Sequence, residues 1–276
     1  YILIFLVSFE LFYYFQKITP FSPAQFFYPN TKVIDFVKEN AGISRFWGYG
    51  SGYIEPNFQT YDETYSTEGV DPLHIREYTE LLTFAKEGKL VTNLPRTDAN
   101  IPSGYGPDGI KNNPLRQKLL NISGVKYVLQ KDETRTGLGP DTLTFPEDSY
   151  KLAWQENPWQ IYENLNATPR VFLTNKYAVA KDKKEALRIF YDEKLDEKKE
   201  LVLYEDPKID QSINLESNLK LLSYAPNKIT IETLANASSL LFISFNYYPG
   251  WEVYFDGENV KILVADYAFR AFNVPS

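Results

Sequence analysis

The stretch SFNYYPGWEVYFDGENVKILV, residues 244–264, decides the fold of the last part of this chain. Asp256-Gly257 is the dipeptide that favours the two central positions of a type I′ hairpin turn. Before this turn, apolar side chains alternate with polar ones over residues 251–255, and the same period of two returns over residues 260–264. The stretch therefore predicts a β-hairpin in which Trp251 is a core residue, in preference to an aromatic platform that binds a ligand.

The alternation that marks this hairpin extends over the whole C-terminal part. From Ile209 onward we expect five or six short strands, separated by turn residues such as Asn227 and Asn236, which is the density of a β-sandwich. We predict a domain boundary near residue 206 and a β-sandwich over residues 207–276. Because the sequence stops after AFNVPS without a turn, we expect the last strand of this sandwich to be missing.

Residues 18–206 combine helical and strand-like patterns, and we predict an α/β domain there. The segment NTKVIDFVKENAG has the apolar spacing of a helix. A second helix is expected from Asp71, its cap, through Pro72 to Gly88, and a third in DKKEALRIFYDE with an Asp182–Glu185 capping box. The segment NPLRQKLLNIS is predicted to be a helix that precedes the strand VKYVL, which is half of a strand–helix–strand alternation. We expect a further short strand in FWGYG and long loops over residues 51–69, 93–113 and 131–148, so the fold class is α+β.

The first fifteen residues, YILIFLVSFELFYYF, are apolar except for Ser8 and Glu10. About 20 residues are needed to span the hydrocarbon of a bilayer, so residues 1–17 are predicted to be the end of a transmembrane helix. The aromatic cluster at residues 12–15 before Lys17 suits the membrane interface. A buried amphipathic helix of a soluble domain is the alternative, and Glu10 favours it because a carboxylate is costly in lipid.

The composition excludes several classes of function. The chain has 276 residues, 43% of them hydrophobic, and a formal net charge of -7 without a cluster of basic residues. Nucleic acid is therefore not an expected partner. The absence of cysteine excludes disulfides, thiolate catalysis and cysteine-ligated zinc.

Four separated motifs resemble one family. The ending NYYPGWEVYFDGENVKILVADYAFRAFNVP is similar to the C-terminal region of YfhO-type bacterial membrane proteins, which have a Tyr-Pro-Gly-Trp strand, an Asp-Gly turn and a Phe-Arg-Ala strand before Val-Pro. Upstream, LLNISGVKYVL, IYENLNATPRVFL and GVDPLHIREYTELL look like three further segments of that family, in the same order along nearly the whole chain.

The resemblance implies a polytopic, glycosyltransferase-C-like membrane glycosyltransferase. Such an enzyme takes sugar from a polyprenyl-phosphate donor and transfers it to a cell-envelope glycan or lipid acceptor. This chain would be its extracytoplasmic C-terminal region, at the cell membrane. In that kind of enzyme the catalytic carboxylate lies between early transmembrane helices, so no catalytic residue carries over and we expect this chain by itself to be non-catalytic. The alternatives are a carbohydrate-binding or scaffolding ectodomain without associated catalysis.

Two sets of residues are candidates for substrate contact. Sugar rings stack on aromatic side chains, and the strand FWG together with the long loop after it carries Trp47, Tyr49, Tyr53 and Tyr61. Core packing is the alternative for these aromatic rings. Arg45, Arg170 and Arg270 each lie within a motif and can bind a phosphate or carboxylate in bidentate fashion. A structural role, joining loops to the sheet, is the favoured alternative for the three arginines.

The remaining polar groups predict no catalytic or metal site. Acidic residues are scattered over residues 55–71 without EF-hand spacing, which is typical of a solvated surface. His74 is the only histidine, and no Gly-x-Ser-x-Gly elbow accompanies it. We therefore predict no metal and no cofactor for this chain, and membrane lipid and a glycan or polyprenyl-phosphate sugar as its partners.

Overall fold

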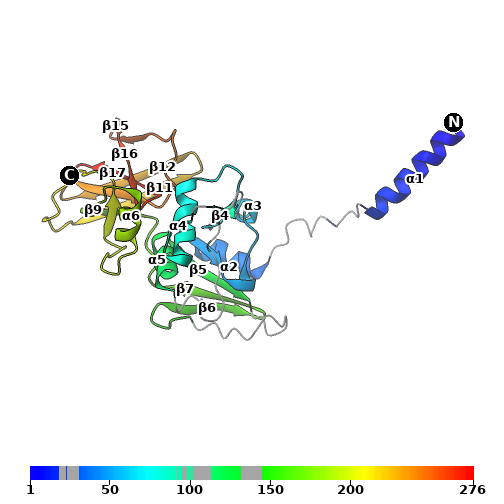
Figure 1. The fold of residues 1–276 in the computed structure, drawn as a ribbon, viewed down its shortest axis with the longest axis horizontal. Helices are drawn as coiled ribbons and strands as arrows, with labels where there is room; N and C mark the ends of the chain where they lie inside the picture. The colour runs from blue at the N-terminus through cyan, green and yellow to red at the C-terminus, as the bar shows by residue number, and fades with distance from the viewer. Residues whose placement is uncertain are drawn as a thin grey trace. The chain divides into compact units, whose positions relative to one another are not determined.

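The computed structural model describes residues 1–18, 23, 31–91, 93–94, 98–99, 101, 113–131 and 145–276. The chain has helices and mixed β-sheets, so it belongs to the α+β class (Figure 1). It divides into two compact units, Tyr1–Asp35 and Phe36–Ser276. The loops predicted over residues 93–113 and 131–148 lie for the most part outside the described residues.

The described helices are of ordinary length except for two single turns. They are α1 (Ile2–Ile18), α2 (Lys32–Asn40), the 3-10 turn η2 (Gly50–Gly52), α3 (Phe58–Tyr61), α4 (Arg76–Glu87), α5 (Pro114–Ile122) and α6 (Lys183–Phe190).

The described strands fall into two larger sheets and three two-stranded pairs. They are β1 (Arg45–Gly48), β2 (Tyr65–Ser66), β3 (Gly69–Val70), β4 (Asp98–Ala99), β5 (Val125–Lys131), β6 (Tyr150–Glu156), β7 (Trp159–Asn164), β8 (Val171–Thr174), β9 (Lys176–Val179), β10 (Glu200–Leu203), β11 (Ser217–Ala225), β12 (Lys228–Ala235), β13 (Ser239–Ile243), β14 (Val253–Phe255), β15 (Glu258–Val260), β16 (Ile262–Ala265) and β17 (Phe269–Val274).

The first sheet has the order β2-β1-β5-β7-β6. Strand β1 runs parallel to β5, as the strand–helix–strand pattern around α5 leads one to expect, and β6 and β7 complete the sheet in antiparallel fashion. The segment 51–69, predicted as a loop without structure, contains η2, α3 and the short strand β2, because close backbone packing orders it. A Cβ at Gly52 would lie 2.4 Å from the carbonyl oxygen of Leu129, so only glycine lets η2 approach β5 this closely.

The second sheet has the order β8-β13-β17-β16-β10-β9. Residue 206, where the sequence predicts a domain boundary, separates β8, β9 and β10 from the other three strands. Strand β8 pairs with β13, and β10 pairs with β16, so strands from both sides of residue 206 form one hydrogen-bonded sheet. Pairing between strands distant in sequence decides this arrangement, which local composition does not encode.

The C-terminal part contains seven strands, where the sequence predicts five or six. The predicted hairpin is β14–β15, and its turn is the predicted one: Asp256 and Gly257 have φ of 49° and 90° and link Phe255 to its partner Glu258. Trp251 lies before β14 and is only partly buried, so the prediction that it is a core residue is wrong. Positive φ at both central positions is the type I′ signature. Side chains of β11, β12, β14 and β15 pack on one face of the six-stranded sheet, which gives a partial sandwich.

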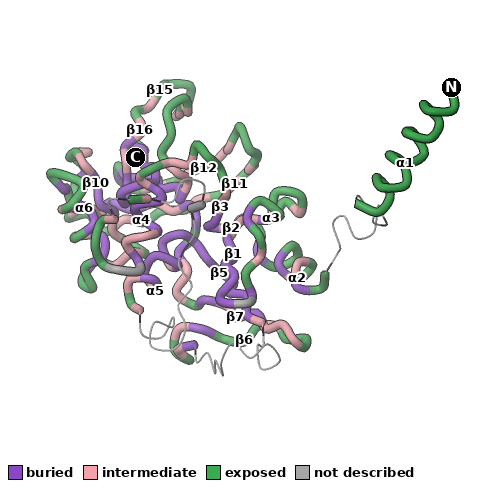
Figure 2. The backbone as a smooth tube through the Cα atoms, turned by 45° about the vertical axis from the view of Figure 1, so that its right-hand side comes forward, coloured by how far each residue is buried: buried purple, intermediate pink, exposed green. Residues whose placement is uncertain are grey.

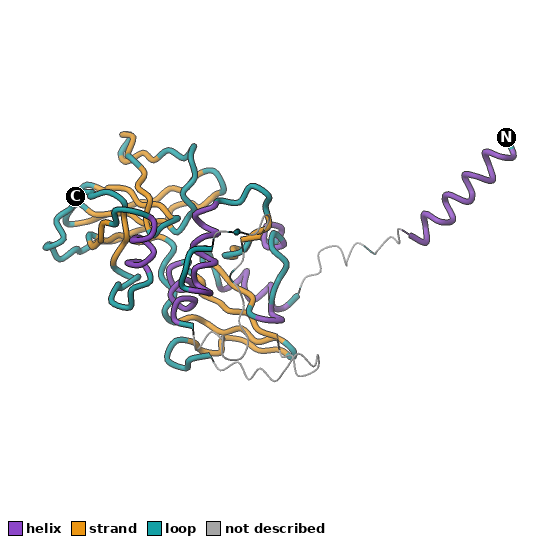
Figure 3. Tube along the Cα trace, in the orientation of Figure 1, coloured by secondary structure: helices purple, strands orange, loops and turns teal. Residues whose placement is uncertain are grey.

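The opposite face of the six-stranded sheet belongs to the main hydrophobic core. Helices α4 and α5 lie between the two larger sheets in Figure 3, and both contribute fully buried leucines, such as Leu81 and Leu119. The same core cluster includes Val128 of the first sheet and Phe242 of the second. Residues 36–276 are thus held together by a core that both larger sheets share.

Helix ends follow the predicted chemistry in part. Gly88 has the left-handed conformation at the C-terminus of α4, and Asp182 Oδ1 accepts a hydrogen bond from the Glu185 backbone N–H at 2.8 Å, as predicted. The start of α4 differs from the prediction, since the helix begins at Arg76 and not at Asp71. The Asp71 carboxylate instead accepts from the Leu73 backbone N–H at 2.7 Å, which stabilises a turn before the helix.

Helix α1 has no buried residue, and Figure 2 shows it exposed along its whole length. Its large apolar side chains are between 48% and 79% exposed, with Val7 and Ile2 at the two limits. None of the helices in the described ranges combines the length and the apolar character required to cross a bilayer.

Candidate functional site

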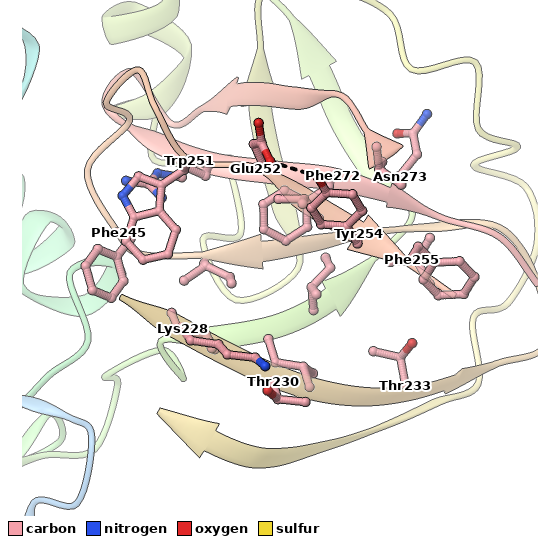
Figure 4. Close-up of a pocket in the computed structure, with 18 of the residues that line it drawn as sticks. Lys228, Thr230, Thr233, Phe245, Trp251, Glu252, Tyr254, Phe255, Phe272 and Asn273 are labelled. Atoms are coloured by element: carbon pink, nitrogen blue, oxygen red, sulfur yellow. Dashed lines mark hydrogen bonds between the residues drawn. The ribbon is translucent and has the colours of Figure 1, made fainter. Parts of the chain in front are cut away.

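A groove of about 820 Å³ lies between the hairpins β11–β12 and β14–β15 (Figure 4). Its floor is one face of the six-stranded sheet. On β13, Leu241 and Ile243 line the groove, whereas Phe242 between them belongs to the main core. Because alternate residues of a strand point to opposite faces, this pattern identifies the floor as a sheet face. We refer to this feature as the hairpin groove.

Polar side chains stand at the rims of the hairpin groove. Figure 4 shows Lys228 and Thr233 on the β12 side, and Glu252 and Tyr254 on the opposite side. The Tyr254 hydroxyl donates to Glu252 Oε2 at 2.7 Å. The groove is therefore apolar at its floor, with hydrogen-bonding groups and charges of both signs at its edges.

Stacked cations and aromatic rings form one end of the hairpin groove. The Arg270 guanidinium carbon lies 4.8 Å from the ring centroid of Trp251 and 5.6 Å from that of Phe245. Both Nε and Nη2 of Arg270 donate to the backbone oxygen of Asn246, at 2.8 and 2.5 Å. The Arg170 guanidinium carbon also lies near Phe245, 5.3 Å from the ring centroid. Cation–π contacts of this kind contribute about 0.5–2 kcal/mol each, so they stabilise this end of the groove.

Arg45 and Arg170 are buried and do not line the hairpin groove. Arg45 donates to the backbone oxygens of Ser123 and Ser244, both at 2.6 Å, and so joins the first sheet to the end of β13. Arg170 donates from Nη1 to the Ile43 backbone oxygen at 2.9 Å. Burial, and then the adjacent charge of Arg45, lower the pKa of Arg170 to about 9. These contacts match the structural alternative for the two arginines, and of the three predicted arginines only Arg270 lines the hairpin groove.

The predicted aromatic residues of the first loop separate into two pairs. Trp47 and Tyr49 are fully buried, with ring centroids 5.5 Å apart, so they have no surface on which a sugar ring can stack. They are core residues, as the alternative stated. Tyr53 and Tyr61 are 40% and 59% exposed, and they do not line the hairpin groove. The four aromatic side chains therefore do not form one binding surface.

The indole of Trp47 contacts a buried carboxyl group, that of Glu68. In the sequence, Glu68 is only one of several scattered acidic residues. The Trp47 indole N–H and the Ile101 backbone N–H both donate to Glu68 Oε1, each at 3.1 Å. Burial raises the pKa of Glu68 to about 7, against the opposing effect of these two hydrogen bonds. No spacing motif marks this residue. Its role in tying the loop to the core is visible only in the tertiary structure.

A second buried acid, Glu80 on α4, also escapes sequence reasoning. Its Oε2 accepts from the Tyr267 hydroxyl at 2.5 Å, and its Oε1 accepts from Arg76 Nε at 2.8 Å. Tyr267 and its neighbour Asp266 have φ of 72° and 48°, a conformation that aspartate tolerates but that is unfavourable for the bulky Tyr267. The link between α4 and the β16–β17 loop thus stabilises a strained backbone.

The remaining polar candidates stay separate. No group of three or more His, Cys, Asp and Glu side chains is placed to hold a metal ion within the described ranges. The ring of His74 lies 3.1 Å from the Asp71 backbone oxygen at the start of α4. Comparison of the chain with protein-family models, with curated proteins and with solved structures finds no match.

Proposed function

We propose that this chain is a membrane-attached extracytoplasmic region of a glycosyltransferase-like membrane protein of the YfhO type. In this proposal it has no catalysis of its own. It helps to position a glycan or lipid acceptor while a membrane-embedded part of the same protein transfers sugar from a polyprenyl-phosphate donor. The four motifs described above support the family, and the exposed apolar surface of α1 supports attachment to a membrane.

The surface of α1 carries the proposal. All of its large apolar side chains are exposed, on every side of the helix, from Ile2 to Ile18. Burying one such side chain in an apolar environment is worth about 1.5–3 kcal/mol, so leaving all of them in water is unfavourable. Seventeen residues of helix extend about 26 Å, close to the ~30 Å thickness of the hydrocarbon layer. A lipid environment, in which Lys17 and the neighbouring aromatic rings lie at the interface, satisfies this surface.

Flotation with phosphatidylcholine–phosphatidylglycerol vesicles tests the attachment. We expect the chain to float with the vesicles, and the double variant Phe5→Lys and Phe9→Lys to remain at the bottom of the gradient. The two lysines together cost about 5 kcal/mol in the hydrocarbon region. Leu73→Lys is the matched control, because Leu73 is 88% exposed and lies outside α1. A parent chain that fails to float contradicts the proposal, as does a Leu73 variant that is lost equally.

Contact with a glycan is a second component, which the exposure of Tyr53 and Tyr61 favours. Titration with chitohexaose and maltohexaose, followed by intrinsic fluorescence, measures it. We expect saturable binding that Tyr61→Ala weakens about tenfold, which corresponds to about 1.4 kcal/mol. Tyr254→Ala is the control, because Tyr254 has a similar exposure of 61% but lies at the hairpin groove. Equal losses in the two variants, or no saturable binding, would leave a scaffolding ectodomain as the function.

A further inference from the structure

We propose that the hairpin groove binds an extended segment of a partner polypeptide, which adds as a β-strand between β12 and β14. This inference rests on the geometry of the groove and does not depend on the membrane proposal. Three observations lead to it: the walls of the groove are strand edges, apolar side chains in these walls are only partly buried, and the second layer of the sandwich is present on both sides of the groove.

The walls present the edges of two strands. On the β12 side, residues 228–231 line the groove without interruption, and on the other side residues 248–255 do so, of which residues 253–255 form β14. Successive residues of a strand face the same space only along its edge, because side chains alternate between the two faces. Among the described strands, β12 pairs with β11 alone and β14 with β15 alone. Each wall therefore offers backbone N–H and C=O groups that no other strand pairs.

The floor is the apolar face of the central strands that lies away from the main core. Leu241 and Phe272 line the groove and are buried, and Leu240 and Ala271, their neighbours on the same strands, belong to the main core. The walls leave more apolar surface uncovered, because Ile231, Val253 and Phe255 pack on this floor but are only partly buried. Apolar side chains placed in the groove would bury part of this wall surface.

On both sides of the hairpin groove, the chain itself already packs a second layer on the six-stranded sheet. On one side, Ile231 of β12 packs on the apolar cluster of the floor, and on the other side Val253 and Phe255 of β14 pack on the same cluster. The second layer of the sandwich is therefore present at both margins and open between them. A strand inserted there would pair with both walls and complete the layer.

The shape and chemistry of the groove select a polypeptide over other apolar ligands. The stretch from Lys228 to Thr233 is six residues long, or about 20 Å of strand, which is the usual length of a strand. An acyl chain would cover the floor but leave the polar groups of both walls unpaired, which is costly once water is excluded. A strand with an apolar residue at every second position satisfies the walls and the floor together. A second copy of this chain would present an equally concave surface.

Titration of the full chain with a synthetic octapeptide tests the proposal. The peptide alternates valine and threonine, carries a lysine at each end and is blocked at both termini. We expect saturable binding by calorimetry, and we expect the amides of both β12 and β14 to gain protection from hydrogen exchange. An analogue that is N-methylated at alternate residues keeps the side chains but loses one row of donors, so it should bind roughly tenfold or more weakly.

Two variants on the same strand locate the site. Ile231→Lys places a charge in the groove and should weaken binding at least about tenfold. Leu234→Lys is the matched control, because Leu234 is 74% exposed and does not line the groove, and binding should change less than about twofold. Near-ultraviolet circular dichroism checks that both variants fold.

Several results would overturn the inference. Binding of the N-methylated peptide as tight as that of its parent would show a simple apolar cavity. Absence of saturable binding at millimolar peptide, or an equal loss in the two lysine variants, would exclude strand addition in the hairpin groove. A dimer in sedimentation that Ile231→Lys dissociates, and that the peptide does not, would show that a second copy occupies the groove.

Discussion

Glu68→Gln is expected to stabilise the fold at neutral and alkaline pH but not at acidic pH. The folded protein holds the Glu68 carboxyl in the core, where burial raises its pKa from the ordinary 4.5 to about 7. Between these two values the folded chain keeps a proton that the unfolded chain has released. The free energy of unfolding therefore falls as pH rises through this window, and it is constant with respect to this group above pH 7.

The difference between 4.5 and about 7 corresponds to about 3 kcal/mol at 1.36 kcal/mol for each pH unit. Glutamine is neutral at every pH and still offers an oxygen to the Trp47 and Ile101 donors. The variant should thus match the parent near pH 4.5 and exceed its unfolding free energy by up to about 3 kcal/mol at pH 8. Asp266, whose pKa burial also raises to about 7, contributes its own pH dependence to both proteins, so the difference between them isolates Glu68.

Urea unfolding followed by circular dichroism, at pH 4.5, 6, 7 and 8, measures this difference. Glu55→Gln provides the control, since it removes an exposed carboxylate from the same loop and should change stability by less than about 0.5 kcal/mol throughout. A Glu68→Gln variant that is less stable than the parent at pH 8, or equally stabilised at every pH, would refute the assignment of a buried, proton-retaining carboxyl.

Three further substitutions probe tertiary contacts between elements that are distant in sequence. Gly52→Ala should lower the free energy of unfolding in urea by more than about 2 kcal/mol, because its Cβ would lie 2.4 Å from a backbone oxygen. Gly69→Ala is the control, since the space around Gly69 is open, and it should change this free energy by less than about 0.5 kcal/mol. Equal effects of the two variants would contradict the close approach of η2 to β5. Arg45→Lys keeps the positive charge but loses the guanidinium group, whose two Nη atoms donate to two backbone oxygens. We expect the free energy of unfolding to fall by about 2–4 kcal/mol in the same assay, and an unchanged value would exclude the bridging role of Arg45. Tyr267→Phe should lower the free energy of thermal unfolding by about 1–2 kcal/mol through loss of its bond to the carboxylate on α4, and an unchanged melting temperature would show that this bond adds nothing.

The sequence alone predicts those features that depend on a few neighbouring residues. Asp256-Gly257 specifies its turn because only two positions need positive φ, and the alternation on both sides of it sets which side chains face the sheet. Gly88 and Asp182 mark helix ends for the same local reason. The exposed apolar character of α1 is likewise a property of one continuous segment. These features require no knowledge of what each element packs against.

Only the tertiary structure decides how the elements combine. The sequence does not distinguish the aromatic residues Trp47 and Tyr49 from Tyr61, but the first two are buried in the main hydrophobic core while the third faces solvent. Strands β8, β9 and β10 pair with the C-terminal strands in one sheet. The sequence does not predict this arrangement, because pairing between distant strands is a backbone interaction without a side-chain signature. The hairpin groove and the raised pKa of Glu68 both arise in this way. Burial and the edges of paired strands are properties of the assembled chain, whereas turns and helix ends are properties of its short segments.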